Sequence, residues 1–202
     1  MLSADECHDQ SVPVRTVATI VIALIAVAGV GASAWGASTS PAVASPSSVR
    51  LGATVLLQPR TRTAGCTKGK EPDRRCSPGA YYSGLTRAVL CSASFRTSSI
   101  RNVPQQEKFA VEREYGMPAG YYGRSIEIDH IVSLELGGSN DIANLFPEPG
   151  SGTANYLVKD RLENRLHDLV CSGAITLRAA QRGIAADWEA LYTHVFGTAA
   201  GR

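Results

Sequence analysis

Hydrophobic and polar residues alternate around position 130, and this alternation is the clearest local signal in the sequence. A period of two predicts a half-buried strand whose alternate side chains face a core, with apolar positions at Ile126, Ile128, Val132 and Leu134. Residues 137–140, Gly-Gly-Ser-Asn, predict a tight turn, because Gly and Asn tolerate positive backbone dihedrals. A short return strand begins at Asn144. The pattern therefore indicates a β-hairpin.

Helical spacing takes over after the hairpin. From Asn155 to Cys171 the apolar residues form one stripe and charged residues occupy the opposite face, which predicts an amphipathic helix. Gly173 ends it, and Thr176 is placed to cap a last helix with an apolar stripe at Leu177, Ala180, Ile184, Trp188, Leu191, Tyr192 and Val195. Upstream, Pro104 and Gly116 bracket a short helix. We predict an α+β fold in which the hairpin is crossed by one helix and wrapped by two or three more.

The first 44 residues differ in composition from the rest. Val17 to Trp35 is an uncharged apolar run, and an Ala/Ser/Pro-rich stretch follows it. Pro41-Ala-Val-Ala44 before Ser45 has the small residues of a cleavage site, which predicts a signal peptide. The alternative is a retained membrane anchor helix, because the run approaches the roughly 20 apolar residues that span a bilayer. Both interpretations make the remainder secreted or extracytoplasmic, with membrane contact only through residues 17–35 if they are not cleaved.

Four cysteines remain after this leader, and none of them shows the close pair spacing of a zinc ribbon. We therefore expect disulfide bonds, in accord with export. Three pairings are possible; the short loop between Cys66 and Cys76 favours pairing these two, which leaves Cys91 with Cys171.

The composition is that of a globular protein, with 44% hydrophobic and 19% charged residues. The net charge is +2, and residues 45–202 hold 19 basic and 15 acidic side chains. This modest excess is compatible with a polyanionic partner but does not identify one. The basic residues are dense in the first part of residues 45–100, which we interpret as a basic, cysteine-containing extension.

Candidate chemistry lies at Asp129 and His130, where charged groups interrupt the apolar alternation. A carboxylate next to an imidazole can hold a hard cation with one side chain and remove a proton from water with the other. An isolated Asp-His pair is more often a surface hydrogen-bonded pair. The spacing through the double glycine, Asn144 and the charged helix favours a site.

At these residues the sequence resembles the HNH nucleases of the ββα-metal superfamily, over residues 124–168, within a domain of residues 101–202. The resemblance implies that His130 is the general base, that Asp129 and Asn155 are metal ligands, and that Asn144 braces the loop through hydrogen bonds. Asp160 is a rival ligand, because Lys159 lies four residues after Asn155 and the family pattern places a lysine three after the third ligand.

The resemblance implies an exported endonuclease that hydrolyses phosphodiester bonds of DNA, with RNA as a further candidate substrate. Its cofactor would be Mg²⁺ or another divalent cation such as Mn²⁺. Basic side chains on and near the helix would contact the phosphates: Arg124, Lys159, Arg161 and Arg165. Two alternatives are an envelope-associated protein that binds nucleic acid or cell-wall polymer through a decayed site, and a purely structural disulfide-bonded domain.

Overall fold

The computed structural model describes residues 49–201, which belong to one compact unit. The predicted signal or anchor segment lies outside the described residues. Within residues 49–201, the helices are all too short or too polar to cross a membrane.

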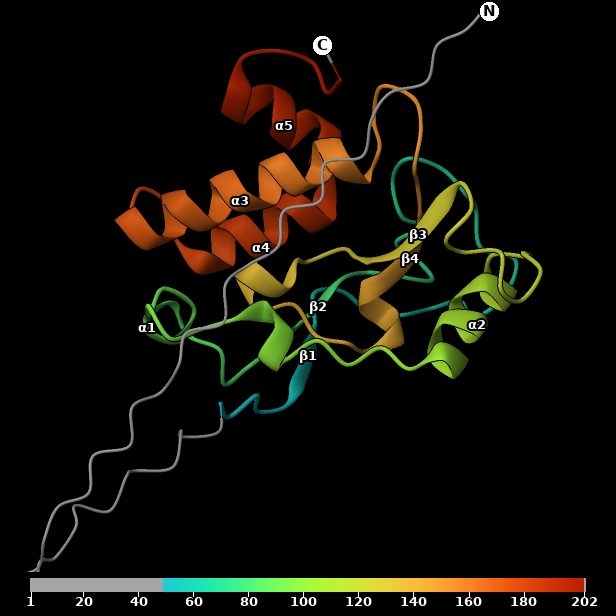
Figure 1. The fold of residues 1–202 in the computed structure, drawn as a ribbon, viewed down its shortest axis with the longest axis horizontal. Helices are drawn as coiled ribbons and strands as arrows, with labels where there is room; N and C mark the ends of the chain where they lie inside the picture. Colours follow the sequence, from blue (N-terminus) through green and yellow to red (C-terminus); the bar gives the residue numbers. More distant parts are fainter. Residues whose placement is uncertain (1–48, 202) are drawn as a thin grey trace, which may run out of the picture. The chain divides into compact units, whose positions relative to one another are not determined.

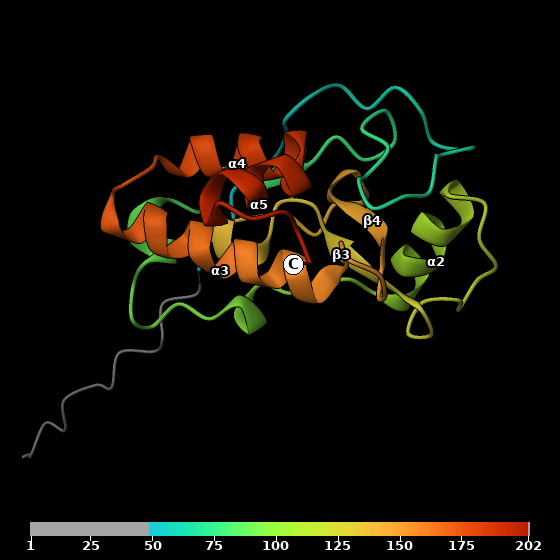
Figure 2. The same cartoon turned by 90° about the horizontal axis from the view of Figure 1, so that it is seen from above.

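A two-stranded antiparallel hairpin lies at the centre of the unit. Strand β3 (Ile126–His130) pairs with β4 (Leu145–Pro149), so that His130 is opposite Leu145 and Glu127 is opposite Glu148. Helix α2 (Gln105–Glu114) lies on one side of the hairpin, and α3 (Tyr156–Ser172) lies on the other side with the remaining C-terminal helices (Figures 1 and 2). The α+β class predicted from the sequence is confirmed.

Strand β3 is shorter than the apolar alternation predicts. It ends at His130, and Leu134–Leu136 forms a 3-10 turn instead of continuing the strand. The backbone of Val132 no longer pairs with a strand, because both its N–H and its C=O bind the Asn144 side chain. The Asn144 amide thus takes the place of a paired strand at Val132, and the strand ends at the Asp-His pair.

The C-terminal helices differ from the prediction at one point. The single last helix predicted from Thr176 is two helices, α4 (Leu177–Ala186) and α5 (Trp188–Phe196). Asp187 separates them because its backbone is extended, with φ −170° and ψ 94°, and its carboxylate accepts from the N–H of Ala190 as the N-cap of α5. The apolar stripe continues through the break and packs α4, α5 and α3 together.

The segment predicted as an extension is part of the same compact unit. Strand β1 (Thr54–Leu56) pairs with β2 (Ala80–Tyr82), and α1 (Arg87–Leu90) follows. Tyr81 in β2 forms an isolated bridge with Gly138 in the hairpin loop. A Cβ atom at Gly138 would lie 1.7 Å from the carbonyl oxygen of Val132, so this turn requires glycine.

Two disulfide bonds join Cys66 to Cys76 and Cys91 to Cys171, which confirms the favoured pairing. The second bond closes a loop of 80 residues between α1 and the end of α3. On the chain-entropy model a loop of this length stabilises the fold by roughly 4 kcal/mol. Disulfides favour an oxidising, extracytoplasmic environment.

Glu71 gives the stability of the fold a specific pH dependence. Its carboxylate accepts from the N–H of Glu189 at 3.1 Å, at the start of α5. Burial, joined by the negative charge of Asp187, raises the pKa of Glu71 from 4.5 to about 7. Because the pKa is raised in the folded state, the contribution of Glu71 to the free energy of unfolding is complete below pH 4.5 and is lost as the pH rises through about 7.

We therefore expect Glu71→Gln, which keeps the accepting oxygen, to remove this loss. Between pH 4.5 and about 8 the wild type should lose about 2 kcal/mol more than the variant, a figure reduced for the partial exposure of the site. Urea unfolding at several pH values measures the difference. Asp168→Asn, at an exposed acid on α3, is the control; equal pH profiles for wild type and Glu71→Gln would contradict the prediction.

Candidate functional site

The Asp-His pair lies where β3 ends, and His130 is only 2% exposed. Its Nε2 atom is 3.1 Å from Oδ1 of Asn140. Its Nδ1 atom is buried and has no hydrogen-bond partner among the described residues; it lies 4.0 Å from Oδ1 of Asp129. One ring nitrogen is therefore anchored and the other is turned toward a carboxylate oxygen.

The surroundings of His130 favour its neutral form. Burial, joined by the positive charges of Arg101 and Lys159, lowers the pKa of the imidazole to about 4. The negative charge of Asp129 and the hydrogen bond to Asn140 oppose this shift. At neutral pH the ring is uncharged, so one of its nitrogens is free to accept a proton.

Asn144 braces the loop that carries the site, as the resemblance implies. It is fully buried at the end of a 3-10 turn (Ile142–Asn144). Its Oδ1 accepts from the N–H groups of Ala80 and Val132 at 3.0 and 2.9 Å. Its Nδ2 donates to the carbonyls of Val132 and Ser139 at 3.0 and 2.8 Å. All four bonding positions of the amide are thus used to join β2, the end of β3 and the turn.

Lys159 of α3 lies at the centre of a group of carboxylates, which we call the carboxylate cluster: Asp129, Glu148 and Glu163. Its ammonium is 1% exposed and donates to Oδ2 of Asp129 at 2.6 Å and to Oε1 of Glu163 at 2.5 Å. The third bond goes to the carbonyl oxygen of His130 at 2.8 Å. The helix is therefore tied directly to the Asp-His pair.

Glu148 has no hydrogen bond within the described part of the chain. Its side chain is fully buried on β4, with Oε2 3.6 Å from Nζ of Lys159. Because the three ammonium protons already bind other oxygens, none is left for Glu148. Burial raises the pKa of the Glu148 and Glu163 carboxyls against the opposing charge of Lys159. Burial also opposes ionisation of Asp129, but the charge and the hydrogen bond of Lys159, joined by the neighbouring His130, together lower that pKa.

The side chains of the two residues predicted as helix ligands differ in whether they are already hydrogen-bonded. Asn155 is the N-cap of α3: its Oδ1 accepts from the N–H of Val158 at 3.3 Å and its Nδ2 donates to the carbonyl of Gly152 at 2.7 Å. Both ends of its amide are thus used locally. Asp160 is exposed on α3, and burial joined by the negative charge of Asp129 raises the pKa of its carboxyl, so its side chain faces solvent.

The basic residues predicted to contact phosphate are not gathered at one place. Lys159 is buried among carboxylates and does not face solvent, which differs from the expectation. Arg161 lies over the rings of Tyr192 and Phe196, at 5.9 and 5.7 Å from their centroids. Arg165 is exposed on α3, and Arg124 lines a pocket of about 380 Å³ beside Lys108 and the outer end of the hairpin.

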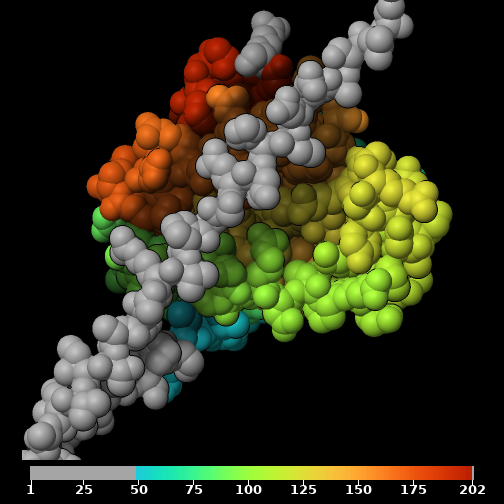
Figure 3. Space-filling view, viewed as in Figure 1, coloured from blue at the N-terminus to red at the C-terminus, as the bar shows by residue number. Residues whose placement is uncertain are grey.

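This pocket belongs to the α2 side of the unit. In the space-filling view, α2 and the loop that follows it lie at one edge of the molecule, and the C-terminal helices lie at the opposite edge (Figure 3). The pocket is also lined by the aromatic residues Tyr122 and Tyr156. Cationic and aromatic side chains together are the surface type that single-stranded nucleic acid binds.

Sequence reasoning missed four residues of the site: Arg101, Asn140, Glu148 and Glu163. Asn140 looked like a turn residue, and nothing local shows that its amide reaches His130. Glu163 is one helical turn after Lys159, a spacing that would have indicated an ion pair. Glu148 lies near the end of the return strand β4, and its burial depends on α3, which packs beside it only in the fold. Arg101 lies before α2, and only the fold brings its charge near the imidazole.

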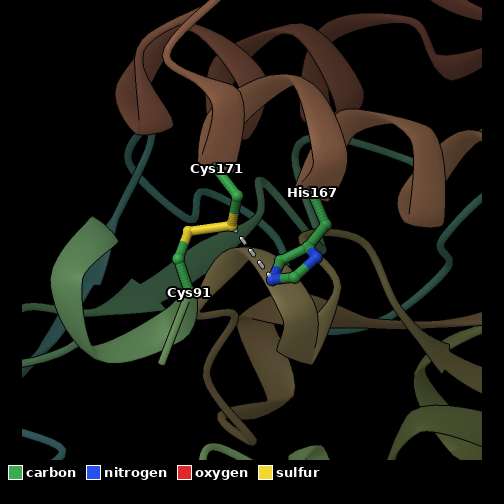
Figure 4. A group of neighbouring side chains, drawn as sticks. All are labelled: Cys91, His167 and Cys171. Atoms are coloured by element: carbon green, nitrogen blue, oxygen red, sulfur yellow. Dashed lines mark hydrogen bonds between the residues drawn. A yellow bond between two sulfur atoms is a disulfide. The ribbon is translucent and has the colours of Figure 1, made fainter. Parts of the chain in front are cut away.

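A second group of potential metal ligands lies at Cys91, His167 and Cys171, whose ligand atoms are all within 4.8 Å of one another. Figure 4 shows the two sulfurs bonded to each other and the His167 ring turned toward them, with Nε2 3.4 Å from Sγ of Cys171. Because disulfide sulfurs lack the thiolate charge that binds metal ions, this group is not a metal site in the oxidised chain.

Comparison of the chain with protein-family models, with curated proteins and with solved structures gave no match.

Proposed function

We propose that this protein is an exported, metal-dependent endonuclease that hydrolyses phosphodiester bonds of DNA, with RNA as a further candidate substrate. The observation that carries the proposal is the unpartnered Nδ1 of a neutral, buried imidazole, 4.0 Å from Oδ1 of Asp129. A water molecule between these two atoms could give its proton to His130 while an oxygen-binding cation is held by Asp129.

The donor atoms fit a hard divalent cation such as Mg²⁺ or Mn²⁺. Asp129 binds Lys159 through Oδ2 only, which leaves Oδ1 for another partner. Asp160 is the solvent-facing carboxylate that α3 offers as a further ligand, and Glu148 adds a buried carboxyl group beside Lys159. A divalent cation here would polarise the scissile phosphate and stabilise the leaving oxygen.

The chain's own residues would perform the remaining tasks. His130 would accept the proton of the attacking water at Nδ1. Lys159 would hold the Asp129 carboxylate in place through its 2.6 Å bond and would fix α3 against β3. Arg101, Lys108 and Arg124 could contact the phosphate backbone, which gives affinity without base preference.

Cleavage assays test the proposal. The purified protein should relax supercoiled plasmid when Mg²⁺ or Mn²⁺ is present and should not do so with chelator. Parallel incubation with RNA determines whether RNA is a substrate. If plasmid and RNA both remain intact with every divalent cation, the nuclease proposal is wrong.

Ligand variants separate the two candidate helix ligands. We expect Asp160→Asn to weaken Mn²⁺ binding about tenfold or more, as measured by calorimetry. Asn155→Ala should bind Mn²⁺ as the wild type does and should lose only about 1 kcal/mol of stability as a missing N-cap. The reverse result would make Asn155 the ligand; wild-type affinity in both variants would exclude both residues.

Lys159 favours a second candidate function. Its ammonium already neutralises Asp129, as a residue that replaces a lost cation would do. An envelope-associated protein that binds nucleic acid or cell-wall polymer would fit this feature. Binding of either polymer without divalent-dependent cleavage, together with no detectable Mn²⁺ binding, would favour that function.

A further inference from the structure

Asn140 is held in the hairpin turn more firmly than a turn residue needs to be. The residue is only 7% exposed. Its Nδ2 donates to the carbonyl oxygen of Ile100 at 2.7 Å and to the hydroxyl of Tyr82 at 3.1 Å. Its backbone N–H donates to the same hydroxyl at 3.1 Å. These bonds fix both the position and the rotation of the amide.

The rotation of the amide determines which atom faces His130. A carbonyl oxygen can only accept, so the amide atom next to Ile100 must be the NH₂ group. The opposite atom, Oδ1, accepts from the backbone N–H of Asn102 at 3.2 Å and lies 3.1 Å from Nε2 of His130. Because this oxygen also can only accept, Nε2 must carry a proton.

A neutral imidazole has one proton and here two acceptors compete for it. Oδ1 of Asn140 is within hydrogen-bond distance of Nε2, whereas Oδ1 of Asp129 is 4.0 Å from Nδ1. Without Asn140, the Asp129 carboxylate would attract the proton to Nδ1. That tautomer would have its lone pair on the wrong nitrogen, facing the turn.

We infer that Asn140 is a positioning residue: it holds His130 in the Nε2–H tautomer and so keeps Nδ1 free to accept a proton. The inference rests on the proposed function only for the use of Nδ1 in cleavage. The tautomer itself is a property of the chain without metal or substrate, and it can be measured separately.

Nitrogen-15 NMR of the imidazoles measures the tautomer directly. Spectra of protein labelled at histidine, recorded without divalent cations at about pH 8, where imidazoles are neutral, distinguish Nε2–H from Nδ1–H through the chemical shifts of the two nitrogens. The signals of His130 are identified by their absence in His130→Ala. We expect Nε2–H in the wild type, and Nδ1–H in the wild type would overturn the inference even before any variant is made.

Variants test the role of Asn140. We expect Asn140→Ala to move the His130 proton to Nδ1, and Asn140→Asp, which retains an oxygen next to Nε2, to keep it at Nε2. Asn102→Ala is the matched control, because it removes a neighbouring exposed side chain and keeps the backbone N–H that binds Asn140. An unchanged His130 spectrum in folded Asn140→Ala would overturn the inference, and if that variant does not fold, loss of Nε2–H in Asn140→Asp would do so.

Cleavage kinetics give a further readout that a purely structural role would not change. In Asn140→Ala, kcat should fall about 100-fold, with little change in the KM for DNA, because the base is in the wrong tautomer while the phosphate contacts remain. Absence of cleavage by the wild type would refute the proposed function and leave the tautomer result standing. A shifted tautomer with unchanged kcat would overturn the role of Asn140 in positioning the base.

Discussion

His130→Ala should abolish cleavage while the fold stays intact. Removal of a general base lowers a rate by about 100- to 10,000-fold, and no other side chain with a free proton-accepting nitrogen lies beside Asp129 among the described residues. Initial rates of plasmid nicking at saturating Mg²⁺ measure the loss. Metal binding should change little, because the proposed ligand atoms are carboxylate oxygens.

The control for this variant is His194→Ala. His194 is exposed on α5 and its ring makes no hydrogen bond within residues 49–201, so its loss should leave the rate at the wild-type value. Circular dichroism and the unfolding midpoint of both variants check that the fold is kept. A nicking rate of His130→Ala equal to that of the wild type would refute the assignment of the base.

Asn144→Ala should cause the largest loss of stability of any single side chain at the site. It would leave two N–H groups and two carbonyls unpaired in a region where Asn144 is fully buried. Each unpaired buried group costs about 1–3 kcal/mol, so we expect a loss of about 5 kcal/mol or more in the free energy of unfolding. Urea unfolding monitored by fluorescence measures it.

Two further variants serve as an intermediate case and as a control for this prediction. Asn144→Asp keeps the accepting oxygen for Ala80 and Val132 but loses both donated bonds, so its loss should be intermediate. Asn164→Ala removes an exposed asparagine of α3 that bonds only the carbonyl of Asp160, and it should change stability by less than about 1 kcal/mol. Similar losses in Asn144→Ala and Asn164→Ala would show that the buried amide does not brace the loop.

The elements whose signals are local could be predicted from the sequence. The hairpin, the helix that begins after Asn155 and the capping residue Thr176 follow from periodicity and from residues that cap or turn. The Cys66–Cys76 pairing followed from a short loop. In each case the residues that decide the structure are neighbours in the sequence.

The two errors in the elements have different physical causes. Strand β3 ends early because Asn144 takes the hydrogen bonds of Val132, which alternation alone cannot show. The last helix breaks at a local signal: Asp187 caps a new helix through the N–H of Ala190, but the continuous apolar stripe hides this break.

The candidate site was predictable in part. Asp129 and His130 were recognised from their place at the end of a strand, and the bracing role of Asn144 came from the resemblance. Lys159 was expected to face a phosphate, because a lysine on the polar face of a helix usually faces solvent. Its burial depends on three carboxylates contributed by β3, β4 and α3, and only the assembled fold brings them together.

Crystals soaked in Mn²⁺ would locate the cation most directly, by anomalous diffraction. We predict one ion bound to Oδ1 of Asp129 at about 2.1 Å, with Nδ1 of His130 facing a water molecule held by that ion. An ion bound elsewhere, or an Asp129 that binds only Lys159 in crystals saturated with Mn²⁺, would contradict a metal-dependent site at the end of β3.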